Sequence, residues 1–221
     1  MGLASPPWVP QPREARDLVG DELRISPLAR FAIACPAILT LVDLIGWVAV
    51  ASQWRKYGHQ FHLALNAAQN HQTVPVPTAP EPFGGLTAVL ILFGIAAIVV
   101  ECMWQFRAAS AARAMGLPAK RSPGWGVGFW FIPVVNLWMP YQAIRDCLAY
   151  DDHSRAMVLR YWLLYVGMGF GAGLTIIGLM VSTPVGVVFA LVAGLCALGV
   201  LATAPQVVVS IAAAHRAAVN P

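Results

Sequence analysis

Three polar residues lie in strongly apolar stretches of this chain, namely Asp43, Glu101 and Asn136. A carboxylate deep in a bilayer costs a few kcal/mol or more, so it is neutral, paired or functional. Asp43 and Glu101 therefore mark a candidate intramembrane proton or cation site, and the alternative is a polar contact that joins helices. Asn136 lies between two prolines, where its amide can satisfy backbone groups left free by the break or contact a ligand.

A second group of residues that could bind a ligand or form ion pairs consists of Arg107, Arg145 and Arg160, which flank the apolar stretches. Long arginine stems allow a guanidinium group to reach a membrane surface from a buried position. We expect the three side chains in one layer, where they bind anionic lipid head groups or form an ion pair with Glu101 that fixes the helices.

Metal and catalytic motifs are weak or absent in the sequence. His59 and His62 have a spacing that lets two imidazoles meet one metal ion, but no Cys, Asp or Glu lies nearby to complete the site. We interpret them as loop histidines and expect no metal and no cofactor. The sequence also lacks the HExxH, GxSxG, phosphate-loop and GxGxxG motifs, which argues against an enzyme.

The composition places these residues in a membrane. Of the 221 residues, 58% are hydrophobic and 11% are charged, whereas soluble domains have about 45–50% and about 25%. This balance excludes a soluble enzyme, a disordered chain and a disulfide-stapled secreted module. The net charge of +4 comes without a dense basic run, so we expect no nucleic-acid partner and interpret the excess as a topology signal.

Four apolar runs are long enough to cross a bilayer, which requires about 20 residues as a helix. The predicted spans are residues 31–52, 86–106, 161–181 and 185–205. Ser26 and Pro27 are expected to start the first span, as N-cap and first-turn proline.

Two polar regions accompany these spans. Residues 1–30 form a proline-rich segment with a short surface helix, ahead of a membrane domain of residues 31–221. Residues 53–85 form the loop between the first two spans, and we expect it outside the cytoplasm.

Residues 123–150 are apolar but interrupted by Pro133 and Pro140. Proline removes a backbone donor and disfavours helix at the preceding residue, so this stretch is predicted as a broken re-entrant or interfacial helical segment. With that topology, only Arg55 and Lys56 of the 14 basic residues lie on the outer side. A fifth span would divide the basic residues nearly evenly between the two sides of the membrane. The positive-inside rule therefore favours four spans with both termini in the cytoplasm.

Glycines recur in the third predicted span at Gly167, Gly169, Gly171 and Gly173. Small residues four apart let two helices approach closely. We expect them to pack against the fourth span near Ala193, and the alternative is a contact with a membrane-protein partner or a second copy through the Gly167 and Gly171 face.

The stretch from Trp104 to Arg145 carries a family resemblance. It contains Arg107, Arg113, Ser122-Pro123-Gly124-Trp125-Gly126, Trp130-Phe131-Ile132-Pro133, Asn136-Leu137, Pro140-Tyr141-Gln142 and Arg145. The stretch resembles the bacterial membrane-protein family called domain of unknown function 4328, over about residues 86–215. The resemblance implies a four-helix membrane domain and brings neither an established activity nor catalytic residues.

The sequence thus predicts an all-α integral membrane protein with four transmembrane helices and one broken segment. We expect a non-enzymatic accessory or scaffolding subunit of the bacterial inner membrane that contacts partner proteins or membrane lipids. One alternative is a small transporter or proton- or cation-conducting protein that uses Asp43 and Glu101. The other is an intramembrane enzyme.

Overall fold

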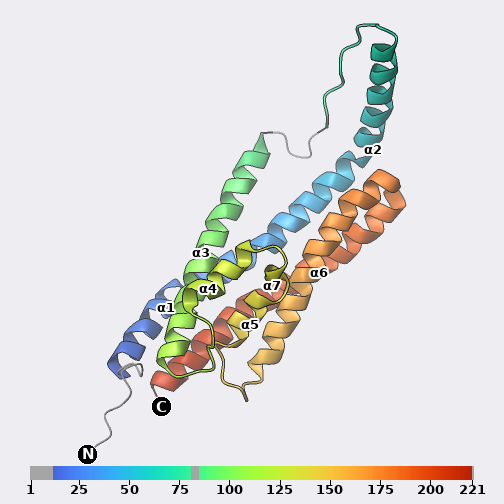
Figure 1. Ribbon diagram of the computed structural model, residues 1–221. Coiled ribbons are helices and arrows are strands. Elements are labelled where there is room, and N and C mark those ends of the chain that lie inside the picture. The colour runs from blue at the N-terminus through green and yellow to red at the C-terminus, as the bar shows by residue number, and fades with distance from the viewer. Residues whose placement is uncertain (1–11, 81–84, 221) are drawn as a thin grey trace, which may run out of the picture.

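Long apolar helices dominate the structure. The computed structural model describes residues 12–80 and 85–220, and these ranges contain helices and turns but no strand. Figure 1 shows the long helices running roughly along one axis. Four segments are long and apolar enough to cross a membrane: Glu14–Ala51, Leu86–Ala114, Ser154–Val181 and Thr183–Val219. The predicted all-α, multi-pass architecture is therefore confirmed.

The bundle is longer than a bilayer is thick. Its long helices are α1 (Pro12–Ala32), α2 (Cys35–Gln69), α3 (Leu86–Ala114), α6 (Ser154–Val181) and α7 (Thr183–Val219). Helix α7 measures about 55 Å, whereas the hydrocarbon core of a bilayer measures about 30 Å. Since α3 and α7 are apolar from their first residues, their C-terminal turns extend beyond the apolar layer, and there they pack against α1.

The first helix does not begin where the sequence predicts. Ser26 lies inside α1, and its Oγ donates a hydrogen bond to the Glu22 carbonyl at 2.9 Å. Pro27 also lies inside α1, and the helical run is interrupted only at residues 33–34, before Pro36 in the first turn of α2. The prediction of Ser26 as N-cap is therefore wrong, because a serine hydroxyl bonds equally well to the carbonyl one turn earlier.

The N-terminal helix belongs to the packed bundle. Its contacts with α3 and α7 are made by one buried stripe, which contains Ala15, Val19, Glu22, Ile25 and Ala29. The boundary predicted at residue 30 does not separate two packing units. Residues 1–11 of the predicted proline-rich segment lie outside the described residues.

Helix α2 continues past its apolar part to Gln69. Its outer turns carry the stacked rings of Tyr57 and Phe61, whose centroids lie 5.8 Å apart. The predicted loop of residues 53–85 is therefore helical over its first half. The proline-rich residues 72–80 are not helical, and residues 81–84 lie outside the described part of the chain.

Helices α6 and α7 form an antiparallel hairpin in which two backbones approach closely. A Cβ atom at Gly171 would lie 2.9 Å from the Ala193 Cβ, and one at Gly178 would lie 2.9 Å from the Gly186 Cα. These separations leave no room for a side chain. The predicted packing of the glycine-rich span against Ala193 is confirmed for Gly171.

The broken segment of residues 123–150 contains no helix long enough to cross a membrane. It contains four short pieces, α4 (Pro123–Gly128), η1 (Phe129–Phe131), η2 (Val135–Leu137) and α5 (Met139–Arg145). Ser122 caps α4 by accepting a hydrogen bond from the Trp125 amide at 3.4 Å. The longest piece has 7 residues, which span about 10 Å as a helix. The prediction of a broken helical segment is confirmed.

Side chains of α3 and α6 hold this segment in place. The Gln105 Nε2 donates a hydrogen bond to the Gly126 carbonyl at 3.2 Å, and the Gln105 Oε1 accepts one from the Trp130 Nε1. The Trp162 Nε1 donates to the Leu137 carbonyl at 2.9 Å. Irregular backbone near lipid requires such partners, because lipid offers none.

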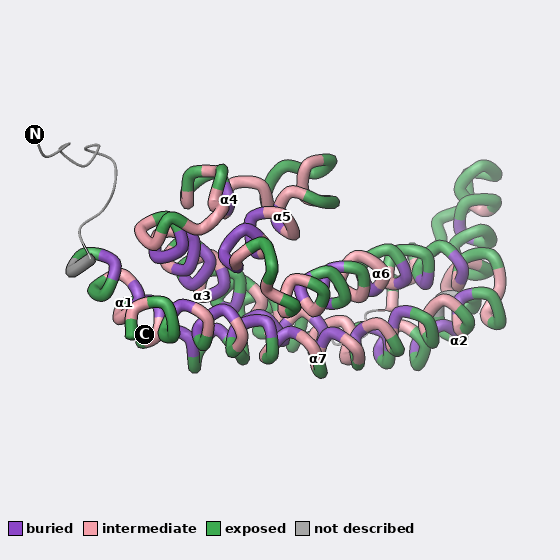
Figure 2. Tube along the Cα trace, turned by 90° about the horizontal axis from the view of Figure 1, so that it is seen from below, coloured by how far each residue is buried: buried purple, intermediate pink, exposed green. Residues whose placement is uncertain are grey.

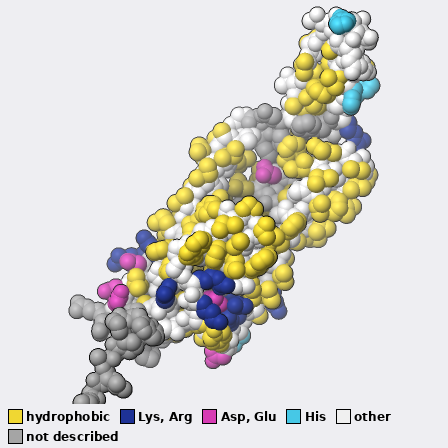
Figure 3. Space-filling model, in the orientation of Figure 1, with side chains coloured by type: hydrophobic (Ala, Val, Ile, Leu, Met, Phe, Trp, Pro, Cys, Tyr) yellow, Lys and Arg dark blue, Asp and Glu magenta, His cyan; other side chains and the backbone are white. Residues whose placement is uncertain are grey.

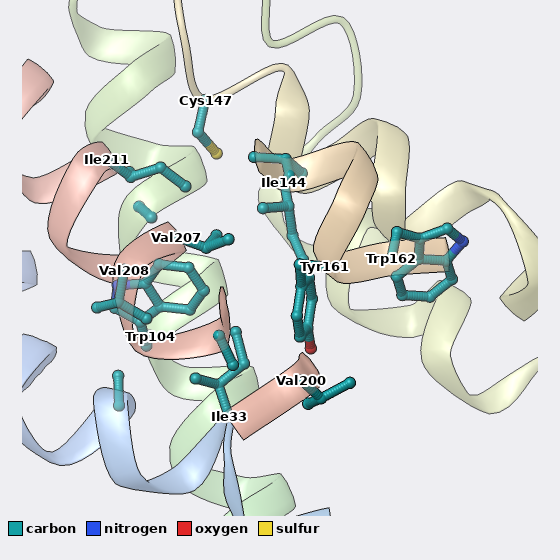
Figure 4. Close-up of a cluster of buried hydrophobic side chains, with 14 of the residues drawn as sticks. Ile33, Trp104, Ile144, Cys147, Tyr161, Trp162, Val200, Val207, Val208 and Ile211 are labelled. Atoms are coloured by element: carbon teal, nitrogen blue, oxygen red, sulfur yellow. The ribbon is translucent and has the colours of Figure 1, made fainter. Parts of the chain in front are cut away.

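The best-packed core lies toward one end of the bundle. Figure 2 shows many of the buried residues where α1, α3, α5 and α7 meet. Trp104 and Tyr161, which are 1% and 0% exposed, are the largest of its fully buried side chains, and Figure 4 shows them beside Ile144 and Val207. The first half of α3 instead exposes large apolar side chains such as Phe93, as a lipid-facing helix does.

We expect Gly171→Ala to destabilise the hairpin by about 1–3 kcal/mol, because its methyl group would overlap with Ala193. Gly173→Ala is the matched control on the same helix, since no atom lies within 4 Å of the added Cβ. Alanine favours helix by up to about 1 kcal/mol over glycine, so the control should keep or gain stability. The measurement is the thermal unfolding midpoint in one detergent, and equal midpoints for the two variants would contradict the packing described here.

Candidate functional site

The structure brings Glu101 and Asn136 to one cavity and leaves Asp43 apart from them. Glu101 and Asn136 line a cavity of about 300 Å³ whose walls come from α2, α3, η1, η2 and α6. Asp43 is exposed and borders a smaller pocket of about 140 Å³ between α2 and α6. The three predicted residues therefore belong to two separate places.

The cavity combines apolar walls with two unsatisfied oxygen atoms. Leu39, Trp130 and Tyr165 are among the side chains that line it. The Glu101 side chain is 94% buried, since the residue is 6% exposed, and its Oε1 receives no hydrogen bond from the described part of the chain. The Asn136 Oδ1 is buried and unpaired in the same way. Buried oxygens without donors are rare, and such a pair in a cavity marks a candidate binding site.

None of the three predicted arginines pairs with Glu101 in the described structure. Arg107 donates a hydrogen bond to the Asp21 carbonyl of α1 at 3.1 Å. Arg145 bonds to Asp146, and Arg160 is exposed on α6. The predicted ion pair with Glu101 is therefore wrong, because Glu101 faces the cavity while the arginines point to other elements.

A cluster of charged residues that sequence reasoning missed surrounds the buried Asp146. Its carboxylate lies 3.3 Å from Arg121, 3.2 Å from Arg145 and 3.7 Å from Arg155. These residues come from both ends of the broken segment and from the start of α6, so only the fold brings them together. We call them the Asp146 cluster, in which three guanidinium groups face one carboxylate.

Burial and hydrogen bonding set the protonation of two groups near this cluster. Burial by itself lowers the pKa of Arg145, but hydrogen bonds to Tyr141 and Asp146 outweigh it and raise the pKa above its ordinary value. Burial also raises the pKa of the Cys147 thiol, and the nearby charges of Glu22 and Asp146 add to this effect. Arg145 is therefore permanently charged, and Cys147 is a neutral thiol of low reactivity.

A second missed cluster joins α1, α7 and the turn that follows α5. The His215 ring is fully buried, its Nδ1 contacts the Glu22 carboxylate, and its Nε2 lies 2.8 Å from the Cys147 carbonyl. Because a carbonyl only accepts, Nε2 is the donor in the contact with Cys147. The partners are 193 residues apart in sequence, so no local pattern could have paired them.

The glycine face predicted as a partner contact packs against α7 of the same chain. Gly171 packs against Ala193, and a Cβ at Gly167 would lie 3.1 Å from the Cys196 sulfur of α7. Gly171 is buried there, whereas Gly167 is half-buried. Gly169 and Gly173 instead line an open groove of about 610 Å³ that also borders Asn136.

Comparison with known proteins agrees with the family resemblance. A family model described as Domain of unknown function (DUF4328) matches residues 67–219. The chain belongs to the DUF4328 family. No curated protein and no solved structure matches the chain. The predicted resemblance is confirmed, although the match begins before residue 86.

The DUF4328 domain contains α3 to α7 but lacks α1 and most of α2. Glu101, Asn136 and the whole Asp146 cluster lie inside the matched range. The cavity nevertheless needs Leu39 of α2, and the second cluster needs Glu22 of α1. Both sites are therefore completed by residues that precede the DUF4328 domain.

We expect His215→Ala to destabilise the protein by about 3–5 kcal/mol, because it leaves the buried Glu22 carboxyl and the Cys147 carbonyl without their partner. Arg216→Ala is the matched control, because Arg216 is exposed on the next position of α7. The thermal unfolding midpoint in detergent is the measurement. A midpoint for His215→Ala equal to that of Arg216→Ala would show that the cluster contributes nothing.

Proposed function

We propose that this DUF4328 protein is a non-enzymatic accessory or scaffolding subunit that binds anionic lipid head groups through the Asp146 cluster. The observation that carries the proposal is the excess of cationic groups in this cluster, next to a segment that exposes aromatic side chains.

The charge of the cluster suits a phosphate. Three guanidinium groups share a single carboxylate, so two positive charges are left without a partner charge. The side chains of Arg121 and Arg145 are 26% and 32% exposed, which leaves donors available to a ligand. Planar guanidinium groups bind phosphate oxygens with two parallel hydrogen bonds.

The surroundings of the cluster suit a membrane surface. Trp125, Phe131 and Trp138 of the broken segment are exposed, and aromatic side chains concentrate where lipid meets water. The segment is bonded to Gln105, close to the end of the apolar part of α3. On the face shown in Figure 3, most lysine and arginine side chains lie in the lower half, below a broad hydrophobic area.

The distribution of basic residues supports an orientation in the inner membrane of a bacterium. Of the 14 basic residues of the chain, all except Arg55 and Lys56 belong to segments that a four-span topology assigns to the side of the Asp146 cluster. The positive-inside rule places that side, with both termini, in the cytoplasm.

The geometry lends less support to a proton or cation pathway that uses both Asp43 and Glu101. Such a pathway needs the two carboxylates to communicate, and they border different pockets. The lipid-binding accessory role requires no such continuity.

We expect the purified protein to bind short-chain phosphatidylglycerol more tightly than short-chain phosphatidylcholine, measured by titration calorimetry in neutral detergent. Each basic residue near a lipid surface contributes about 1 kcal/mol, so Arg121→Gln and Arg155→Gln should each weaken phosphatidylglycerol binding about fivefold. Arg216→Gln is the control, because it removes an exposed charge outside the cluster. Equal affinity for the two lipids, or equal loss in the control, would refute the proposed site.

We expect a cysteine at Gln69, the exposed last residue of α2, to react with a membrane-impermeant maleimide added to intact spheroplasts. A cysteine at Lys120, which is exposed at the opposite end, should react only after the membrane is opened. The unsubstituted chain serves as the blank for its native cysteines. The reverse pattern of labelling would invert the proposed orientation.

A further inference from the structure

The cavity around Glu101 lies apart from the Asp146 cluster and is not used by the proposed lipid contact. We propose that it is a binding site for a small hydrophobic organic cation, whose ammonium group meets Glu101 and Asn136 while its hydrocarbon body fills the apolar part of the cavity.

The charge of the lining selects a cation. Glu101 is the one charged residue among the described residues that line the cavity, and no Lys, Arg or His faces it there. Its buried Oε1 and the Asn136 Oδ1 are both acceptors without donors. An ammonium group carries several N–H donors and one positive charge, so it would satisfy both oxygens and pair with the carboxylate.

The chemistry of the walls selects an organic cation over a metal ion. Calcium and magnesium ions take at least six oxygen ligands, whereas the cavity offers mainly carbon atoms around two side chains with unpaired oxygens. The rings of Trp130 and Tyr165 line the cavity, and aromatic faces attract organic cations. Leu39 and Ile98 supply further apolar surface for the rest of the ligand.

The size and position of the cavity fit a small amphiphile. Its volume of about 300 Å³ lies at the lower end of the range of small-molecule sites. It is bordered by three membrane spans, α2, α3 and α6, together with η1 and η2. A ligand that partitions into the membrane would therefore be concentrated near the site.

The test uses 1-aminoadamantane as the cationic probe and 1-adamantanol as its neutral counterpart of nearly the same shape. Titration calorimetry on the purified full chain in neutral detergent should show saturable binding of one amine per chain. The alcohol should bind at least tenfold more weakly, because it cannot pair with the carboxylate. Absence of saturable amine binding, or equal affinity for the two probes, would overturn the proposal without the use of any variant.

Variants then assign the binding to this cavity. Glu101→Gln retains the shape of the side chain but removes its charge, so it should weaken amine binding at least tenfold. Ala97→Phe keeps Glu101 but fills the cavity, because Ala97 is one of the lining residues, and it should also abolish binding. Unchanged amine binding in either variant would overturn the assignment.

Two control variants separate this site from the other charged groups. Asp43→Asn removes the other carboxylate of the apolar spans, which borders a different pocket, and it should bind the amine like the unsubstituted protein. Arg121→Gln should also leave amine binding unchanged, so failure of the lipid proposal and failure of this one are distinguishable. Loss of amine binding in Asp43→Asn, with binding kept in Glu101→Gln, would place the site elsewhere.

Discussion

The backbone of residues 123–150 must find hydrogen-bond partners close to lipid, and the arrangement of both candidate sites depends on how it does so. Short helices leave amide and carbonyl groups unpaired at their ends, and hydrocarbon offers no replacement. Gln105 and Trp162 supply partners and attach the segment to α3 and α6. This attachment brings Asn136 to the wall of the cavity and places Arg121 and Arg145 beside Asp146.

A second attachment fixes the opposite side of the same region. His215 of α7 bonds to Glu22 of α1 and to the carbonyl of Cys147, directly after Asp146. A buried cluster of this kind is costly to break, because each partner left behind is a desolvated polar group. The last turns of α7 and the N-terminal helix therefore stabilise the element that carries the arginines, although α1 lies outside the DUF4328 match.

The two acidic residues of the apolar spans show how position sets chemistry. Asp43 and Glu101 look equivalent in the sequence, since each is a lone carboxylate in an apolar run. In the structure Asp43 is exposed on α2, whereas Glu101 is buried beside aromatic rings and an unpaired amide oxygen. Only the second environment combines a buried carboxylate with a cavity of about 300 Å³.

The sequence by itself determined the four spans and the broken segment. Apolar run length and proline position are local properties, so the free energy that favours these elements depends on residues close in the chain. The glycine face at Gly171 was predictable for the same reason, because close helix approach needs small residues four apart. Ser26 and Pro27 were misassigned because the same pair fits both a helix start and a helix interior.

Only the tertiary structure decided which polar groups meet. Glu22 and His215 are 193 residues apart, and Arg121, Arg145 and Arg155 converge on Asp146 from separate elements. The expected ion pair of Glu101 with an arginine is not formed in the described structure. Side-chain length and charge do not determine how a helix is rotated about its axis in a bundle. That rotation is set by packing, such as the burial of Trp104 and Tyr161, and packing is a property of the whole fold.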